Sequence, residues 1–253
     1  MVALNFRPEV PVFDANVGVG DRRDEPSVCR CRADLMGEMD RLGVARALIY
    51  HAQAETSSPV AGNEQLAAWL DDDGRLTPQW VALPTEASLA QIKALHAQGK
   101  VRSVRLFSTR AAKLPFRPWS YDPLLSWLSE ARVPTWISLP DADAHELVST
   151  LRVYPELVTV LVGAHYLHAL WVRPVLQALP NAHLELSRYE PLGEVEALRD
   201  AFGAERLVYG SWYPRYAMGP ILFYLHHTTL SQKELALVCA GNLERILEGA
   251  SHD

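Results

Sequence analysis

The sequence contains little of what marks secreted, membrane-spanning or nucleic-acid-binding proteins. Its 253 residues include only three cysteines, too few for a disulfide framework. No apolar stretch approaches the roughly 18 residues that a membrane-spanning helix needs. The first residues, MVALNFRPEV, lack the basic-then-apolar pattern of a signal peptide. The sequence therefore predicts a cytoplasmic protein with no membrane partner.

Charge of one sign is not concentrated anywhere along the chain. The formal net charge is −6, from 24 Lys and Arg against 30 Asp and Glu, and no block of basic residues stands out. Binding to a nucleic-acid backbone depends on such basic clusters, so no nucleic-acid partner is expected. Hydrophobic residues, in contrast, make up 49% of the chain, which is enough to bury a sizeable core.

Short apolar runs alternate with amphipathic segments throughout the sequence. The runs are rich in Val, Leu and Ile and are bounded by Pro, Gly, Asn or Asp, a pattern typical of buried strands. The expected strands are 10–18, 45–51, 78–84, 102–108, 134–140, 158–164, 182–187 and 206–212. The expected helices include 33–43, 86–99, 121–132, 143–154 and 194–203. Before the fourth of these helices, Asp141-Ala-Asp143 supplies an N-cap.

Eight strand–helix alternations predict an α/β fold, a single (β/α)8 TIM barrel that spans residues 1–253 as one domain. The alternative is a doubly wound open sheet, whose dinucleotide-binding form needs a glycine-rich first turn. The first turn here, NVGVGD, has Gly18 and Gly20 but no third glycine at the required spacing. No linker, low-complexity segment or repeat divides the chain.

Alternation along each strand predicts which side chains point into the barrel. In the first strand, the apolar Phe13, Ala15 and Val17 are expected to face the helices. The residues expected inside are Asp14, Asn16, Gly18, Arg105, Trp136, Ser138, Leu161, Gly163, His165, His183, Glu185, Ser187, Val208, Gly210 and Trp212. Buried charges must be paired. We therefore expect Arg105 to contact one of the two interior carboxylates, Asp14 or Glu185.

Several segments are similar, in the same order, to the motifs of one protein family. VFDANVGVG looks like an Asp-x-His-x-His first strand, and LVTVLVGAHYL like a sixth strand that ends in histidine. AFGAERLVYGSWYP is similar to a last strand that ends in Gly-Ser-Asp-Tyr-Pro. Over nearly its whole length the chain resembles the amidohydrolase-related (amidohydrolase 2) family. The resemblance implies a (β/α)8 barrel with metal-dependent hydrolase or decarboxylase chemistry.

The chain departs from this family at most of the metal-binding positions. Asn16 and Gly18 stand where the resemblance implies two histidines, Ser138 where it implies a third, and Trp212 where it implies an aspartate. His165, at the end of the sixth strand, is retained. A metal site in this scaffold needs several imidazoles or carboxylates on one ion. The sequence therefore predicts no metal at this position, and it indicates no other cofactor.

The polar residues near the strand ends are candidates for a small-molecule site. His165 is the candidate general acid or base, and its alternative role is to stabilise a loop through hydrogen bonds. Arg105 would bind a carboxylate through its planar fork or serve in an internal ion pair. Trp212 would stack on a planar ligand or fill space. The candidate substrate-binding residues are Arg105, Asn16, His51, Ser138 and Trp212, with Asp14 and Glu185 as interior charges.

Three functions remain open at this point. The first is a divergent barrel that has lost its metal and binds a small anionic ligand, such as a carboxylate, at the C-terminal mouth. The second is a metal-independent hydrolase, lyase or decarboxylase that uses His165. The third is a non-catalytic interaction protein that acts through its outer surface or by forming homo-oligomers. The sequence does not identify the substrate, the oligomeric state or the pathway, and it does not establish whether the protein is an enzyme.

Overall fold

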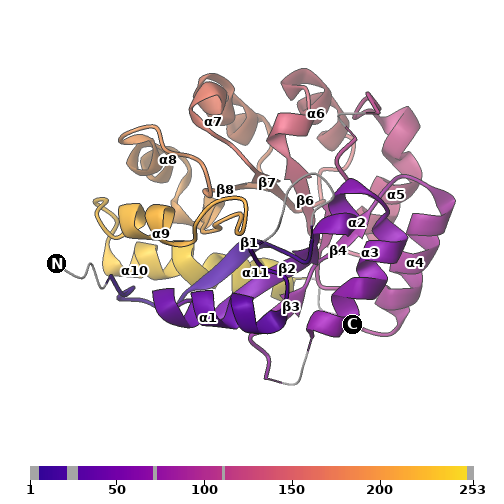
Figure 1. Ribbon diagram of the computed structural model, residues 1–253. Helices are drawn as coiled ribbons and strands as arrows, with labels where there is room; N and C mark the ends of the chain where they lie inside the picture. The colour runs from indigo at the N-terminus through magenta and orange to yellow at the C-terminus, as the bar shows by residue number, and fades with distance from the viewer. Residues whose placement is uncertain (1–5, 22–27, 71–72, 110–111, 250–253) are drawn as a thin grey trace.

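The computed structural model describes residues 6–21, 28–70, 73–109 and 112–249, and it shows parallel strands surrounded by helices (Figure 1). The strands are β1 Phe13–Val19, β2 Arg46–His51, β3 Leu76–Pro78, β4 Trp80–Ala82, β5 Val104–Leu106, β6 Thr135–Ser138, β7 Thr159–Val162, β8 Ala182–Glu185 and β9 Leu207–Val208. The helices are α1 Arg32–Leu42, α2 Ala52–Thr56, α3 Pro59–Leu66, α4 Glu86–Ala97, α5 Pro118–Glu130, α6 Ala144–Leu151, α7 Ala169–Ala178, α8 Glu194–Phe202, α9 Gly219–Leu225, α10 Gln232–Ala236 and α11 Asn242–Glu248.

The strands pair in sequence order, in one set from β1 to β3 and another from β4 to β9. The two sets meet at Gln79, which lies between β3 and β4 and donates its N–H to Ile49 O at 2.8 Å. β3 and β4 are therefore two halves of one extended run that passes from β2 to β5. This run corresponds to the strand expected at 78–84.

The barrel is closed by the segment that follows β9. The N–H of Ala15 donates to Tyr209 O at 3.1 Å, and the N–H of Gly18 donates to Tyr213 O at 2.7 Å. Val17 and Tyr213 form a parallel bridge. Eight strand positions thus form a closed ring, which confirms the predicted (β/α)8 barrel. We call residues 209–213 the seam.

The helices begin and end where local chemistry favours it. Asp143 accepts hydrogen bonds from His145 N at 2.9 Å and Glu146 N at 3.1 Å, which confirms the expected N-cap of α6. Helix α1 ends at Leu42, and the next residue, Gly43, caps it with a φ of 72°, the left-handed conformation that glycine favours. Within the described ranges, no helix has the length and apolar character needed to cross a membrane.

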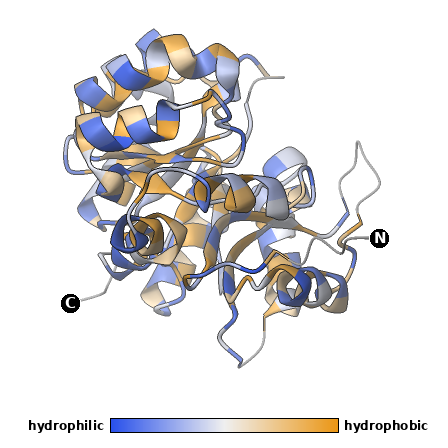
Figure 2. Cartoon of the chain, turned by 90° about the vertical axis from the view of Figure 1, so that its left-hand side faces the viewer, coloured by the Kyte–Doolittle hydropathy of each residue, from blue (hydrophilic) through white to orange (hydrophobic). Residues whose placement is uncertain are grey.

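Buried apolar side chains form separate clusters on the two sides of the strands. Figure 2 shows the hydrophobic colouring gathered on the strands and on the helix sides that face them. The large cluster between strands and helices includes Leu35, Ile49, Leu124, Leu161 and Leu184. The cluster inside the barrel contains Phe13, Ala15, Leu48, Trp136, Val160, Val162 and Val208, together with Ala240, Leu243, Ile246 and Leu247. Helix α11 therefore closes the N-terminal end of the barrel.

The predicted orientations were wrong in two strands. Phe13 and Ala15 pack inside the barrel rather than against the helices, because the pairing of β1 with β2 shifts between Asp14 and Val17. Leu161 packs outside, and its neighbours Val160 and Val162 fill the interior. The run TVLV is apolar at nearly every position, so alternation could not fix its orientation. The inward orientations of Arg105, Trp136, Glu185 and Val208 are confirmed by their contacts.

Candidate functional site

A cavity of about 360 Å³ opens at the C-terminal ends of the strands. It brings together three residues that the sequence singled out, Ser138 at the end of β6, His165 after β7 and Trp212 in the seam. The rest of its wall comes from Glu55, Thr56, Ser108, Pro140, Asp141, Arg188, Arg215 and Tyr216. We call this space the mouth cavity. It lies at the end of the barrel where enzymes of this fold carry their active sites.

The Trp212 side chain forms one wall of the mouth cavity and is fixed on several sides. The residue is 5% exposed, and its indole Nε1 donates to the hydroxyl of Tyr50 at 3.1 Å. The guanidinium of Arg215 lies over the indole, 4.9 Å from the ring centroid. The φ of Trp212 is 55°, a left-handed value that is uncommon for a residue other than glycine. The indole is therefore part of the packed structure.

Gly163, which follows β7, leaves the space that the Trp212 indole fills. Its φ is 75°, and a Cβ at this position would lie 2.6 Å from Cζ3 of Trp212. We expect Gly163→Ala to lower the free energy of unfolding by about 2–4 kcal/mol, since it adds a steric clash to the cost of a left-handed alanine. Urea unfolding would measure the change.

Gly99→Ala is a matched control for this prediction. Gly99 has a φ of 69°, but nothing lies within 4 Å of a Cβ placed there. It should therefore show only the backbone cost, about 1–2 kcal/mol. Equal losses in the two variants would contradict the argument that Gly163 serves the Trp212 indole.

Arg105 is buried beneath the mouth cavity and pairs with a residue that the sequence did not indicate. It is 1% exposed, and its Nη2 lies 2.8 Å from Oε1 of Glu55 in α2. Its Nη1 donates to Oδ1 of Asn16 at 3.2 Å, and its guanidinium lies over the Tyr50 ring. The expected contact with Asp14 or Glu185 was therefore wrong. Glu55 was missed because it lies in AQAET, a short helix that the strand pattern did not predict.

Asn16 connects this ion pair to the interior carboxylate Glu185. Its Oδ1 accepts from Arg105 and its Nδ2 donates to Oε2 of Glu185 at 3.1 Å. Ser187 also donates to Glu185, from its backbone N at 2.8 Å and from its hydroxyl at 2.9 Å. Arg105 and Asn16 thus lie in a buried network and do not line the mouth cavity. Glu55, which belongs to the same network, does line it.

Burial controls the protonation of the two interior carboxylates. Desolvation raises the pKa of Glu185 to about 7, although its hydrogen bonds from Ser187 and Asn16 act in the opposite direction. Desolvation likewise raises the pKa of Asp14 to about 6, against hydrogen bonds from Ser211 and from the N–H of Asn16. Both carboxyls consequently titrate close to neutral pH.

His165 lies at the edge of the mouth cavity beside a second histidine. Its Nδ1 accepts from Leu167 N at 3.3 Å, and its ring centroid lies 4.2 Å from that of His168. Burial lowers the pKa of His165, and the nearby Arg188 acts in the same direction. Both effects favour the neutral form of the imidazole. Within the described chain, no hydrogen bond engages its Nε2.

His51, a candidate for substrate binding, lies outside the mouth cavity. It is 4% exposed at the start of α2, where its Nδ1 accepts from Gln53 N at 3.3 Å. Its Nε2 is packed against Gly20, and a Cβ built on Gly20 would lie only 2.2 Å from this nitrogen. The side chain therefore caps a helix and fills space beside a turn.

Two arginines of the mouth cavity were not found from the sequence. The Arg188 guanidinium lies 4.5 Å from the centroid of the Tyr216 ring, and Arg215 covers Trp212. In the part of the chain that is described, neither arginine forms an ion pair. Both lie in loops just after strand ends, in SRYEP and WYPRY, beyond the positions that strand alternation can assign.

The side chains around the mouth cavity do not form a suitable site for a metal ion that needs several imidazole or carboxylate ligands. Across the described residues, no three His, Cys, Asp or Glu side chains come together as possible ligands. Asn16 is engaged with Arg105 and Glu185, and the Trp212 indole stands at the last strand. Zinc sites require three or four nitrogen, sulfur or carboxylate ligands. These residues do not provide them.

Comparisons with known proteins agree with this architecture. A family model described as amidohydrolase matches residues 32–248. None of the curated proteins matches the chain in sequence.

Several solved structures share the fold over nearly the whole chain. An uncharacterized TIM-barrel protein from Bordetella bronchiseptica has a TM-score of 0.73 at 16% identity, covering 96% of this chain and 100% of its own. 5-Carboxyvanillate decarboxylase from Sphingomonas paucimobilis has a TM-score of 0.73 at 13% identity, covering 95% and 99%. A putative 2-pyrone-4,6-dicarboxylic acid hydrolase from Pseudomonas putida has a TM-score of 0.70 at 16% identity, covering 96% and 100%. At these identities the likeness establishes the fold.

Proposed function

The chain belongs to the amidohydrolase family, and we propose that it is a divergent member that binds a small carboxylate in the mouth cavity without a metal ion. The observation that carries this proposal is the pair Arg188 and Arg215, each with its guanidinium over an aromatic ring of the cavity wall. A guanidinium uses no N–H group in such a contact, so its N–H groups can donate to a planar anion.

The charge balance of the mouth cavity also supports an anionic ligand. Its acidic residues are Glu55 and Asp141, and its basic residues are Arg188 and Arg215. Glu55 is already paired with Arg105, so its charge is compensated from below. The two cavity arginines then outweigh the one remaining carboxylate, and a bound carboxylate would restore the balance.

The residues at the family's metal positions support a function that does not use the metal. Asn16 and Trp212 are held in other hydrogen bonds, Gly18 has no side chain, and Ser138 offers a neutral hydroxyl. Without a metal-bound water of lowered pKa, a hydroxide nucleophile of that type is not generated. In this proposal, the residues that replace the metal ligands, Trp212 among them, form part of the cavity that binds the carboxylate.

Metal-independent catalysis through His165 is the second candidate. Its imidazole lines the mouth cavity with Nε2 free of the described chain, and the lowered pKa favours the neutral form, which can accept a proton from a bound molecule or from water. Hydrolysis, decarboxylation and lyase reactions each include such a proton transfer. Turnover that is abolished by His165→Gln, with carboxylate binding retained, would select this candidate.

Calorimetric titration with phthalate, a rigid dicarboxylate, tests the binding proposal, with phthalamide as the neutral control. We expect phthalate to bind, and Arg188→Gln and Arg215→Gln each to weaken it about tenfold, since a charge-assisted hydrogen bond contributes about 1.5–3 kcal/mol. Lys233→Gln, which removes an exposed charge from α10, should leave the affinity unchanged.

Three results would overturn the proposal. The first is phthalate binding that neither arginine variant weakens. The second is the absence of phthalate binding, which would overturn it equally and would favour the non-catalytic interaction protein. The third is stoichiometric zinc, manganese or iron in the purified protein, lost together with activity on chelation. Elemental analysis of the full chain would detect it.

A further inference from the structure

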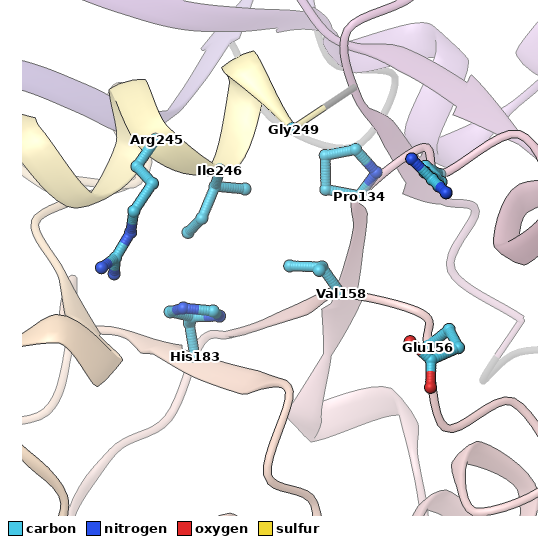
Figure 3. Close-up of a pocket in the computed structure, with 8 residues that line it drawn as sticks. Pro134, Glu156, Val158, His183, Arg245, Ile246 and Gly249 are labelled. Atoms are coloured by element: carbon cyan, nitrogen blue, oxygen red, sulfur yellow. The ribbon is translucent and has the colours of Figure 1, made fainter. Parts of the chain in front are cut away.

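A second cavity, of about 270 Å³, lies at the opposite end of the barrel from the mouth (Figure 3). Its walls come from segments just before β6 and β7, from the start of β8, and from α11. The described residues that line it are Arg132, Pro134, Glu156, Val158, His183, Arg245, Ile246 and Gly249. We call it the base cavity. The apolar cluster inside the barrel separates it from the mouth cavity.

The base cavity has an apolar part formed by three side chains. Pro134 and Val158 precede their strands, and Ile246 points down from α11 towards the strand that carries His183, as Figure 3 shows. Ile246 is 6% exposed and belongs to the interior cluster. These side chains form an apolar surface next to solvent, where a ligand with a hydrocarbon body would gain free energy by burying it.

Two arginines provide positive charge at the edge of this apolar surface. Arg245 donates from Nη2 to Glu205 O at 3.1 Å and to Asn242 Oδ1 at 3.3 Å, so its guanidinium is held in place by neutral oxygens. Arg132, just after α5, is exposed. Neither has an ion-pair partner in the described chain. Among the described residues of the lining, Glu156 is the one acidic side chain, so their net charge is positive.

His183 adds a flat, uncharged wall. Burial lowers its pKa to about 4, and the charges of Arg206 and Arg245 act in the same direction. At neutral pH the imidazole of His183 is therefore uncharged and packs as an aromatic surface.

From this arrangement we propose that the base cavity is a second binding site, for a small carboxylate with an aromatic or branched apolar body. The carboxylate binds the edge of Arg245 beside His183, the body lies on Pro134, Val158 and Ile246, and Arg132 adds positive charge to the cavity. The site is separate from the mouth cavity and holds whether or not the mouth binds a ligand. It places a ligand on α11, the helix that closes the barrel.

Histidine NMR can test this site in the intact protein, because each cavity contains its own reporter. Long-range 1H–15N spectra of the imidazoles would follow His183 at the base and His165 at the mouth, with His183→Gln to assign the signal. We expect benzoate to shift the His183 signals in a saturable way and to raise the pKa of His183, since a bound anion stabilises the imidazolium. Benzamide, which has the same shape without the charge, should bind at least about fivefold more weakly.

Variants connect the response to the two arginines. Arg245→Gln should raise the benzoate Kd reported by His183 about fivefold, a change on the scale of one exposed charge pair, and Arg132→Gln should raise it by a smaller factor. Lys233→Gln should leave it unchanged. The proposal is overturned if benzoate leaves His183 unshifted, if benzamide acts as strongly, or if the double arginine variant responds like the original chain. A shift of His165 without one of His183 would overturn this site and leave the mouth proposal intact.

Discussion

Replacing Arg105 by methionine is expected to lower the free energy of unfolding by about 3–5 kcal/mol. The change leaves Glu55, which is 6% exposed, without the guanidinium that compensates its charge. It also removes the donor to Asn16 Oδ1 and the contact with the Tyr50 ring. Urea unfolding of the two proteins would measure the difference.

A double-mutant cycle separates the ion pair from the packing of the long side chain. Glu55→Gln together with Arg105→Met removes both charges, so the double variant should recover part of the loss. Recovery of at least about 1 kcal/mol relative to additivity is expected for groups in direct contact. Strict additivity would show that the pair contributes nothing as a pair and would contradict the prediction.

Trp212→Ala is expected to cost about 3–5 kcal/mol, because it removes a large buried ring and leaves a cavity where the indole packs on Gly163. Trp212→Phe keeps a ring but loses the hydrogen bond to the Tyr50 hydroxyl, a loss of about 1 kcal/mol. Thermal and urea unfolding would compare the two. If both variants lost the same small amount, the indole would not be a packed wall of the cavity.

The sequence predicted the architecture because its signals are repeated. Each strand is a short apolar run, and the resemblance of several segments in order agrees with the family model over residues 32–248. Orientation was predictable where polar and apolar residues alternate, as around Arg105 and Glu185. It was not predictable where a strand is apolar throughout, as at Leu161, or where pairing shifts within the strand, as between Asp14 and Val17.

The candidate site was predicted in part. Ser138, His165 and Trp212 meet in one cavity because each ends a parallel strand, and strand ends converge in a barrel. Glu55, Arg188 and Arg215 were not predicted, because their positions depend on loop conformation and on a five-residue helix. No periodicity in the sequence fixes where such side chains point.

The seam has two structural roles. Residues 209–213 complete the ring of strands through their backbone, and they carry the indole that forms a wall of the mouth cavity. A residue inserted or deleted there would shift the pairing with β1 and open the ring, so the length of this segment is fixed. Exchanging side chains in place, in contrast, changes the wall of the mouth cavity at this edge while the ring of strands stays closed.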